Sequence, residues 1–219
     1  MADLTKIYRH RFDDSDRADM DAVWQVLVTN FFKRWIKPDD AVIDIGAGLC
    51  NFINNVSAKR RIAFDADPSV TERAAPGVEV ITGTNLIGHD LEGSLNVAFL
   101  SNFLEHLENG DAVLSMLNDV HKLLKPGGKI LILQPNFALT GPDYFDFIDH
   151  KTILTEKSVY EALELTGYDI TFSKKRFLPY TSKSRTPRHP WLVRLYLLMP
   201  PAQWLMAGQS FFVGQKPGA

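Results

Sequence analysis

The chain has 219 residues, of which 45% are hydrophobic and 23% are charged, and its formal net charge is −2. These values are ordinary for a globular protein, and a chain this long can form a stable hydrophobic core without a structural metal or a disulfide. The one cysteine, Cys50, excludes an intrachain disulfide. Residues 1–21 are rich in charge and have no apolar core, unlike a signal peptide, so we expect a cytoplasmic location.

The C-terminal part of the chain is strongly basic. From Ile170 onward there are eight Lys and Arg residues and no Asp or Glu, so this part carries +8 and the rest of the chain −10. Such a bias indicates an anionic partner, or alternatively a basic face that is simply solvated. The most apolar stretch, Trp191 to Met206, is interrupted by Arg194, Pro200 and Pro201, which argues against a membrane-spanning helix.

Apolar residues at three- and four-residue steps predict a helix from Arg17 to Trp35. The β-branched run from Ala41 to Ile45 ends at Gly46 and predicts a buried strand that enters a tight loop. A helix at Phe52 to Ala58 should follow. The remaining predicted strands are Arg61–Phe64, Val78–Ile81, Leu95–Leu100, Lys129–Leu133, Tyr168–Phe177 and Phe211–Gln215.

Two further helices are predicted between these strands. One carries Val113, Leu117, Val120 and Leu124 on a single face and must stop at Lys125-Pro126-Gly127-Gly128. The other is capped by Thr155 and runs through Leu165. Alternating strands and helices imply an α/β fold with a mostly parallel sheet covered on both faces. We expect one domain over residues 1–219, with a helical cap at 1–36 and an insertion at 178–208 between the last two strands.

The segment Val42-Ile43-Asp44-Ile45-Gly46-Ala47-Gly48 predicts a ligand site. Glycines let the backbone approach a ligand closely and adopt φ values that are closed to other residues. In an open α/β sheet, ligands bind beyond the carboxyl ends of the strands. Asp65 ends the second strand, where a carboxylate can accept both hydroxyls of a ribose. A nicotinamide dinucleotide is disfavoured, because its fingerprint requires a third glycine where Asn51 stands.

Four segments in order resemble the motifs of class I S-adenosylmethionine-dependent methyltransferases of the bacterial small-molecule type. They are Val42–Gly48, Phe64–Pro68, Ser101–Leu107 and Leu124–Lys129, and the resemblance covers about Ala41 to Tyr168. It implies a Rossmann-like sheet of seven strands whose last strand is antiparallel. It also implies S-adenosylmethionine as cofactor and methyl transfer to a small-molecule acceptor.

The resemblance further implies which residues contact the cofactor. The glycine loop would pack against its methionine part, Asp65 would hold its ribose, and Ala66 would lie beside the adenine. A side chain after the third strand would bond the adenine amino group, and two residues leaving the fourth strand would line the methyl-transfer site. In chain order, the expected contacts are Asp44, Gly46, Ala47, Gly48, Asp65, Ala66, Thr84 or Asn85, Ser101, Asn102 and His106.

His150 follows the fifth strand, where loops on the acceptor side gather, and stands next to Asp149. It is our candidate general base, and a structural histidine is the alternative. Asn96 stands where related sequences commonly carry Asp, and we interpret it as structural. We find no acidic cluster of the Mg²⁺-dependent catechol type and expect no metal. The fourth strand is followed by Ser101-Asn102-Phe103-Leu104 and not by the Asn/Asp-Pro-Pro-aromatic motif of nucleic-acid amino-methylating enzymes, so no nucleic-acid partner is expected.

Residues 178–208 are predicted to form a lid on the acceptor side. Basic residues beside Trp and Leu favour an anionic or lipid- or glycan-linked acceptor and a peripheral membrane contact. Packing within the domain or across a dimer contact is the alternative, and the oligomeric state stays open. The rival function is that of a non-catalytic S-adenosylmethionine-binding or scaffold protein.

Overall fold

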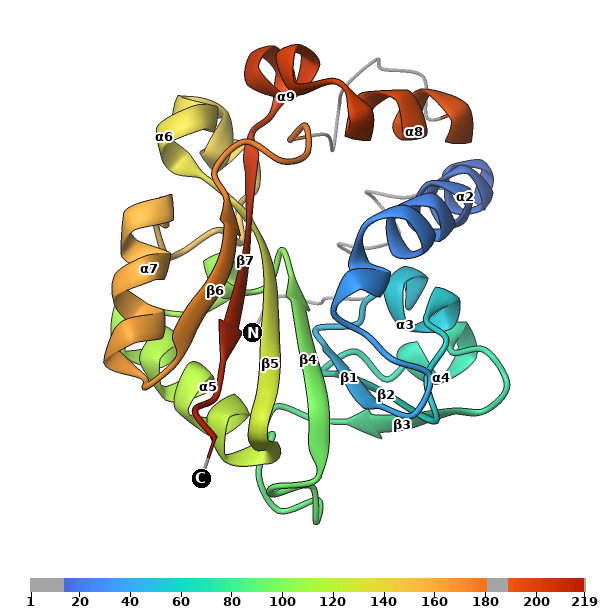
Figure 1. The fold of residues 1–219 in the computed structure, drawn as a ribbon, viewed down its shortest axis with the longest axis vertical. Coiled ribbons are helices and arrows are strands. Elements are labelled where there is room, and N and C mark those ends of the chain that lie inside the picture. Colours follow the sequence, from blue (N-terminus) through green and yellow to red (C-terminus); the bar gives the residue numbers. More distant parts are fainter. Residues whose placement is uncertain (1–13, 181–188, 219) are drawn as a thin grey trace.

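The structure is a computed structural model that describes residues 14–180 and 189–218. Seven strands form one sheet in the order β3-β2-β1-β4-β5-β7-β6. Strands β1 to β5 are parallel, whereas β7 runs antiparallel to both of its neighbours (Figure 1). The strands are β1 (Ala41–Ile45), β2 (Arg60–Asp65), β3 (Val78–Thr82), β4 (Leu95–Ser101), β5 (Leu124–Pro135), β6 (Asp169–Lys174) and β7 (Gln209–Gln215). This arrangement confirms the predicted α/β fold and its antiparallel last strand.

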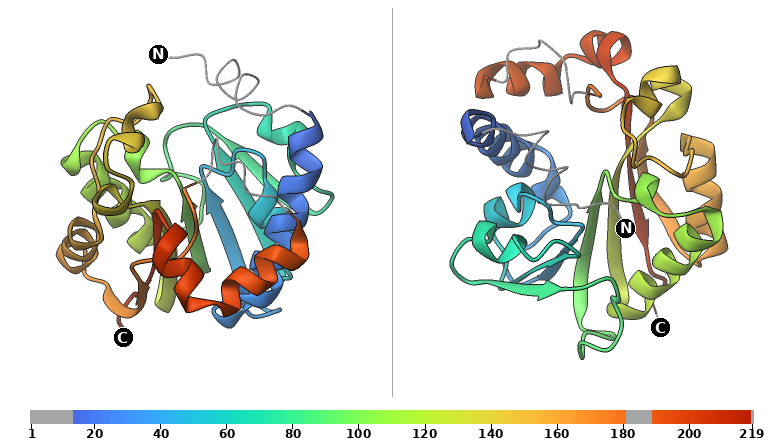
Figure 2. Two further views of the ribbon diagram at one scale, coloured as in Figure 1. Left: turned by 90° about the horizontal axis from the view of Figure 1, so that it is seen from above. Right: turned by 180° about the vertical axis from the view of Figure 1, so that it is seen from behind.

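Helices cover both faces of the sheet. α5 and α7 pack on one face, and α2, α3 and α4 pack on the other, while α8 and α9 lie beyond the carboxyl ends of the parallel strands (Figures 1 and 2). The helices are α2 (Asp14–Asn30), α3 (Asn51–Asn55), α4 (Val70–Arg73), α5 (Gly110–Leu123), α6 (Phe137–Thr140), α7 (Glu156–Leu165), α8 (Pro190–Leu198) and α9 (Pro200–Met206), with short 3-10 helices η1 (Phe32–Arg34), η2 (Leu104–His106) and η3 (Gly141–Asp146).

The central strands are apolar on both sides because both faces are covered. Successive side chains of a strand point to opposite faces. In β1, Ile43 and Ile45 therefore join the core beneath α5 and α7, and Val42 joins the core beneath α2 and α3. All three side chains are 0% exposed. The one polar exception in the same run is Asp44, which is also buried.

The predicted N-terminal helix ends earlier than the apolar pattern indicated. α2 stops at Asn30, and η1 follows it, so Trp35 is outside the helix. Adjacent residues of an α-helix point about 100° apart, yet Phe31 and Phe32 are both buried. The break at Phe31 lets the two rings enter the same aromatic cluster, where Phe31 stacks on Phe177 at 4.2 Å and Phe32 contacts Phe99 at 5.2 Å.

Several other boundaries differ from those predicted. α5 ends at Leu123, before the Pro-Gly-Gly sequence, as expected, but Leu124, which was predicted to lie on the helix, is the first residue of β5, and β5 includes residues 124–128. Its pairing with β4 shifts register between Leu95 and Val97, which accommodates the extra residues as a bulge. The helix expected over residues 52–58 is the shorter α3, and β6 is shorter than the predicted strand at both ends.

α7 begins as the sequence predicted. The Thr155 hydroxyl accepts a hydrogen bond from the Ser158 N–H, and the Ser158 hydroxyl accepts one from the Thr155 N–H, which makes a capping box. The sequence did not reveal α6 and η3. The segment 178–208 contains α8 and α9, each with a proline at its start; Lys183, Arg185 and Arg188 lie outside the described residues.

Candidate functional site

The loop after β1 is held in a shape that requires glycine. Gly46 has φ +72°, Gly48 has φ +52°, and Cys50, the residue that precedes α3, has φ +59°. The N–H groups of Gly46 and Ala47 both donate to the Phe64 carbonyl, at 2.9 and 3.1 Å. A Cβ at position 46 would lie 2.4 Å from a Phe103 ring carbon. The loop therefore turns sharply at the carboxyl edge and lies against the segment that leaves β4.

Asp65 ties the end of β2 to this loop. Its Oδ2 accepts a hydrogen bond from the Gly48 N–H at 2.7 Å, and its Oδ1 accepts one from the Asp67 N–H at 2.8 Å. The residue is 5% exposed, and the neighbouring Ala66 is exposed. Each carboxylate oxygen can accept more than one hydrogen bond. Asp65 can therefore hold the loop and still accept donors from a ligand.

A second carboxyl group, that of Asp44, lies below the same loop. It is 3% exposed, and burial together with the negative charge of Asp65 raises its pKa to about 8. The guanidinium of Arg73 donates to the Gly48 carbonyl at 3.0 Å and to Asp67 Oδ2 at 3.2 Å. Two carboxyl groups so close together favour a ligand that brings positive charge, since a nearby cation stabilises the ionised form.

Cys50 shows no sign of reactivity. Its side chain is buried, and burial together with the charges of Asp44 and Asp65 raises its thiol pKa to about 12. Reactive thiols have lowered pKa values and some exposure. The thiol is a small buried group within the core beneath α2 and α3.

The other expected cofactor contacts also lie on loops at the carboxyl edge. Thr84 and Asn85 are exposed after β3, and Asn85 Oδ1 accepts a hydrogen bond from the Ile87 N–H at 3.1 Å. Ser101 ends β4. Asn102 has φ +48°, and its side-chain amide donates to the Ser101 hydroxyl at 3.1 Å. The strand order places these loops side by side with the glycine loop, because β3, β2, β1 and β4 are consecutive in the sheet.

Beyond Asn102, the structure groups Glu105 and His106 of η2 with His150. Glu105 Oε1 lies 3.9 Å from His150 Nε2 and 4.0 Å from His106 Nε2. Glu105 is 0% exposed, and burial raises its pKa. The two imidazole rings meet edge to face, with centroids 5.0 Å apart. Both histidines are separate candidates in the sequence, but nothing in the sequence predicts that they meet around one carboxyl group.

His150 itself is more enclosed than the sequence indicated. Its side chain is 4% exposed, and its ring stacks on Phe147 and meets the Tyr144 ring edge to face, each with centroids 5.0 Å apart. The neighbouring Asp149 contacts His106, with its carbonyl oxygen 3.1 Å from His106 Nδ1.

Two buried polar residues at or just beyond the end of β5 were not predicted as site residues, and one of them, Gln134, contacts this cluster. Gln134, near the end of β5, donates through Nε2 to Glu105 Oε2 at 3.0 Å. Asn136 begins α6 and donates to Glu156 Oε2 at 2.8 Å and to the Ser210 hydroxyl at 2.9 Å. The only signal in the sequence was a polar pair around Pro135 directly after an apolar strand.

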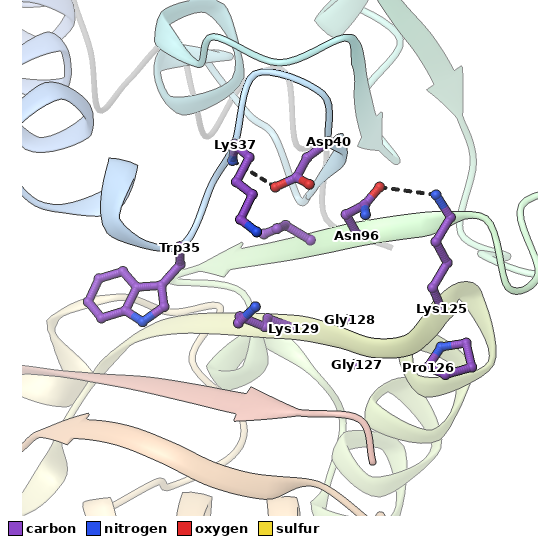
Figure 3. A pocket seen from close by; sticks show the side chains of 10 residues that line it. Trp35, Lys37, Asp40, Asn96, Lys125, Pro126, Gly127, Gly128 and Lys129 are labelled. Carbon is purple, nitrogen blue, oxygen red and sulfur yellow. Dashed lines mark hydrogen bonds between the residues drawn. The ribbon is translucent and has the colours of Figure 1, made fainter. Parts of the chain in front are cut away.

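A small pocket of about 180 Å³ lies at the opposite end of the sheet (Figure 3). There Asn96 Oδ1 accepts hydrogen bonds from the Ala41 N–H at 3.0 Å and from Lys125 Nζ at 3.2 Å, and Asp40 Oδ2 accepts one from the Lys37 N–H at 2.7 Å. Asn96 thus joins the start of β1 to Lys125 at the bulged start of β5, which supports its interpretation as structural. The pocket is remote from the glycine loop, because it opens at the amino ends of the strands.

Comparison with known proteins identifies the family. Residues 17–172 match the family model described as a methyltransferase domain. The fold is similar to that of S-adenosylmethionine-dependent methyltransferases from Archaeoglobus fulgidus (TM-score 0.65, 16% identity, 90% of this chain and 94% of that one) and Mesorhizobium loti (0.65, 15%, 87% and 98%). It is also similar to the [4+2]-cyclase SpnF (0.60, 13%, 89% and 81%). A search of curated protein sequences finds no match.

The chain belongs to the class I S-adenosylmethionine-dependent methyltransferases, and its cofactor is S-adenosylmethionine. The residues present fit this cofactor, because the loop has the glycine conformations that allow close approach and the adjacent carboxyl groups suit ribose hydroxyls and a cationic ligand. In the described parts of the chain, no helix is both long enough and apolar enough to cross a membrane.

Proposed function

We propose that the chain transfers a methyl group from S-adenosylmethionine to a small acceptor that carries an anionic or a lipid- or glycan-linked group. One observation carries the cofactor half of this proposal: the Asp65 carboxylate, at the end of β2, is hydrogen-bonded to Gly48 in the loop after β1. This hydrogen bond joins the glycine loop, with its positive φ angles, to a buried carboxylate. Both lie at the edge where α/β sheets bind nucleosides.

The cofactor contacts of the proposal follow from these positions. Gly46, Ala47 and Gly48 would face the methionine part of the cofactor, above Asp44, and Asp65 would accept the ribose hydroxyls. The exposed Ala66 and the exposed pair Thr84 and Asn85 would flank the adenine. Ser101, Asn102 and His106 would continue the site towards the reacting methyl group. All of these residues lie at or beyond the carboxyl ends of β1 to β4.

The protein's part in the chemistry is chiefly alignment. S-adenosylmethionine, when bound, supplies a methyl carbon made electrophilic by a sulfonium. The chain holds the acceptor in line and excludes water, and such positioning can contribute up to roughly 7–11 kcal/mol. A base is needed where the acceptor is a hydroxyl. His150 stays our candidate for that role, and it would act from the enclosed side of the site, beside Glu105.

Within the described residues, the acceptor would be covered by α2, from the cap expected at residues 1–36, and by α8 and α9, from the insertion at 178–208. α8 lies against α2 (Figure 2), and Tyr196 donates its hydroxyl to the Phe177 carbonyl at 3.0 Å, which fixes α8 to the core. We propose that the chain is one domain in which these two segments form the lid.

The outer surface of the insertion supports a lipid-linked or membrane-associated acceptor. Trp191 is 56% exposed, in contrast to the burial that packing within the domain would require. Arg194 is exposed on α8, and the Arg176 guanidinium lies over the Trp204 ring at 5.5 Å. Large apolar residues are exposed along both helices and at the position between them. They are Trp191, Leu195, Leu198, Met199, Trp204, Leu205 and Met206. Exposed aromatic and basic side chains on short helices favour contact with an anionic lipid interface.

Release of labelled methyl groups tests the reaction itself. The protein would be incubated with methyl-labelled S-adenosylmethionine and with three panels of hydroxylated acceptors. One panel is anionic, one is lipid-linked and one is neutral. Incorporation that requires Asp65 and prefers the anionic or lipid-linked panel would support the proposal. Tight binding of S-adenosylhomocysteine without incorporation into any panel would contradict it and favour the non-catalytic alternative.

Vesicle flotation tests whether the exposed surface of α8 and α9 binds anionic lipid. Wild-type protein should float with anionic vesicles at low salt and less so at high salt, because surface attraction is screened. A Trp191→Ser, Trp204→Ser double variant should lose this association. Ile148→Ser is the matched control, since Ile148 is 94% exposed but lies outside α8 and α9. Equal flotation of all three proteins, or of none, would remove the membrane part of the proposal.

A further inference from the structure

Three side chains from two separate segments converge beside the proposed methyl-transfer site. Glu105 and His106 belong to η2, and His150 follows η3. Each offers one ligand atom, and these three atoms lie within 4.8 Å of one another. A carboxylate and two imidazoles are therefore close enough together for one ion to contact all three after small side-chain movements.

Glu105 is the part of this cluster that most requires a partner. Its Oε2 accepts the hydrogen bond from Gln134, but its Oε1 is buried and accepts none from any residue that the structure describes. Burying a carboxylate oxygen without a compensating donor or cation is costly. Oε1 faces the two histidines at 3.9 and 4.0 Å, distances too long for hydrogen bonds.

His106 is oriented so that its second nitrogen faces Glu105. Its Nδ1 lies 3.1 Å from the Asp149 carbonyl oxygen and 3.4 Å from Asp149 Oδ2. Donation of the Nδ1 proton to the carbonyl places the lone pair on Nε2, the atom nearest Glu105. Metal-binding histidines commonly have such a backing acceptor. The His106 side chain is 32% exposed, so the cluster is open on this side.

We propose that Glu105, His106 and His150 bind a divalent transition-metal cation such as Zn²⁺. Two imidazoles and one carboxylate form a ligand set that Zn²⁺ takes at catalytic sites, with a further position left open. A tetrahedral zinc ion with bonds of 2.0–2.2 Å separates its ligands by about 3.3–3.5 Å. The two Glu105–histidine separations of 3.9 and 4.0 Å need to shorten by roughly half an ångström, and the remaining pair of ligand atoms lies within 4.8 Å, so side-chain rotations would have to close the site around the ion. No metal was expected from the sequence, which has no acidic cluster of the Mg²⁺-dependent catechol type, and His150 lies 45 positions after Glu105.

The role of this cation rests on the proposed function. An acceptor hydroxyl at the open position would have a lowered pKa and would release its proton to solvent. Its oxygen would then form the bond to the methyl carbon as the carbon–sulfur bond breaks, with the electron pair remaining on sulfur. His150 would in that case serve as a ligand and not as the base. The metal site and the identity of the acceptor are tested separately.

Metal binding to the full-length protein tests the proposal directly. Protein stripped with chelator would be titrated with Zn²⁺ against a chromophoric competitor and, in parallel, with Co²⁺ while its visible spectrum is recorded. We expect one Zn²⁺ per chain and the strong visible bands of four-coordinate Co²⁺. His106→Ala, His150→Ala and Glu105→Gln should each weaken Zn²⁺ binding at least tenfold.

The matched control is His121→Asn. His121 lies in the last turn of α5, outside the cluster, and its ring contacts Tyr168, so its loss should leave Zn²⁺ affinity unchanged. Wild-type protein that binds no Zn²⁺, or binds it no better than His150→Ala, would overturn the proposal. If Glu105→Gln fails to fold, the Co²⁺ spectrum of the wild type and the two histidine variants still decide it. S-adenosylhomocysteine affinity, measured separately, shows whether a failure belongs to the cofactor site or to the metal site.

Discussion

Replacing Asp44 by Asn should alter how the stability of the protein depends on pH. Asp44 is buried, and its pKa in the folded protein is raised to about 8, whereas an Asp in an unfolded chain has a pKa of about 3.9. Between these two values the folded state binds a proton that the unfolded state does not. A folded state that binds more protons loses stability as pH rises. Asn preserves an oxygen that can accept the hydrogen bond from the Ile53 N–H but does not titrate.

The size of the effect follows from the same values. One proton held only by the folded state lowers the free energy of unfolding by about 1.4 kcal/mol for each pH unit inside the window. From pH 5 to pH 7 the contribution of Asp44 is therefore a loss of about 3 kcal/mol. The Asn variant lacks this loss, so its stability relative to the wild type should rise by that amount over the same range.

Urea unfolding at several pH values and constant ionic strength measures this difference. Other perturbed groups, such as Glu105 with its raised pKa and His121 with its lowered pKa, are present in both proteins and cancel in the comparison. A wild-type-to-variant difference that stays constant between pH 5 and pH 7.5 would refute the reasoning, because Asp44 would then have the same pKa in both states.

Three further predictions concern the cofactor and acceptor sites. Asp65→Ala should weaken binding of S-adenosylhomocysteine by about 1.5–3 kcal/mol, the usual loss of a hydrogen bond to a charged group, or roughly tenfold to a hundredfold; unchanged affinity in calorimetric titration would dismiss the assignment. Gly48→Val should remain folded but lose the thermal upshift that the cofactor gives, since the φ of +52° and the close approach suit glycine; a full wild-type upshift would be the contrary result. His150→Ala should lower turnover tenfold or more while S-adenosylhomocysteine affinity stays within about twofold, and undiminished turnover would exclude both the base and the ligand role.

The sequence predicted the parallel part of the sheet well because its central strands, β1 and β4, are buried on both faces. Residues 41–45 were predicted with the bounds observed, since a short β-branched run between Asp40 and Gly46 has no competing interpretation. The capped start of α7 was likewise a local signal, because Thr155 and Ser158 satisfy each other's backbone N–H groups. Local chemistry of this kind needs no knowledge of the rest of the fold.

Features that depend on distant contacts were not predictable in the same way. The break at Phe31 depends on Phe99, Phe177 and Phe211, which the sequence alone does not place nearby. The cluster around Glu105 depends on the backbone hydrogen bonds from the Lys151 and Thr152 N–H groups to the Glu105 carbonyl, at 2.8 and 3.1 Å. These bonds bring the loop after η3 onto η2, and no periodic pattern encodes them.

A crystal structure of the protein bound to S-adenosylhomocysteine tests the central claim most directly. We predict that both ribose hydroxyls lie within hydrogen-bonding distance of the Asp65 carboxylate, at about 2.5–3.0 Å, with the adenine beside Ala66 and the amino-acid part over the glycine loop at 46–48. A nucleoside bound elsewhere, for example in the pocket beside Lys125 at the amino ends of the strands, or one whose ribose has no contact with Asp65, would contradict the account.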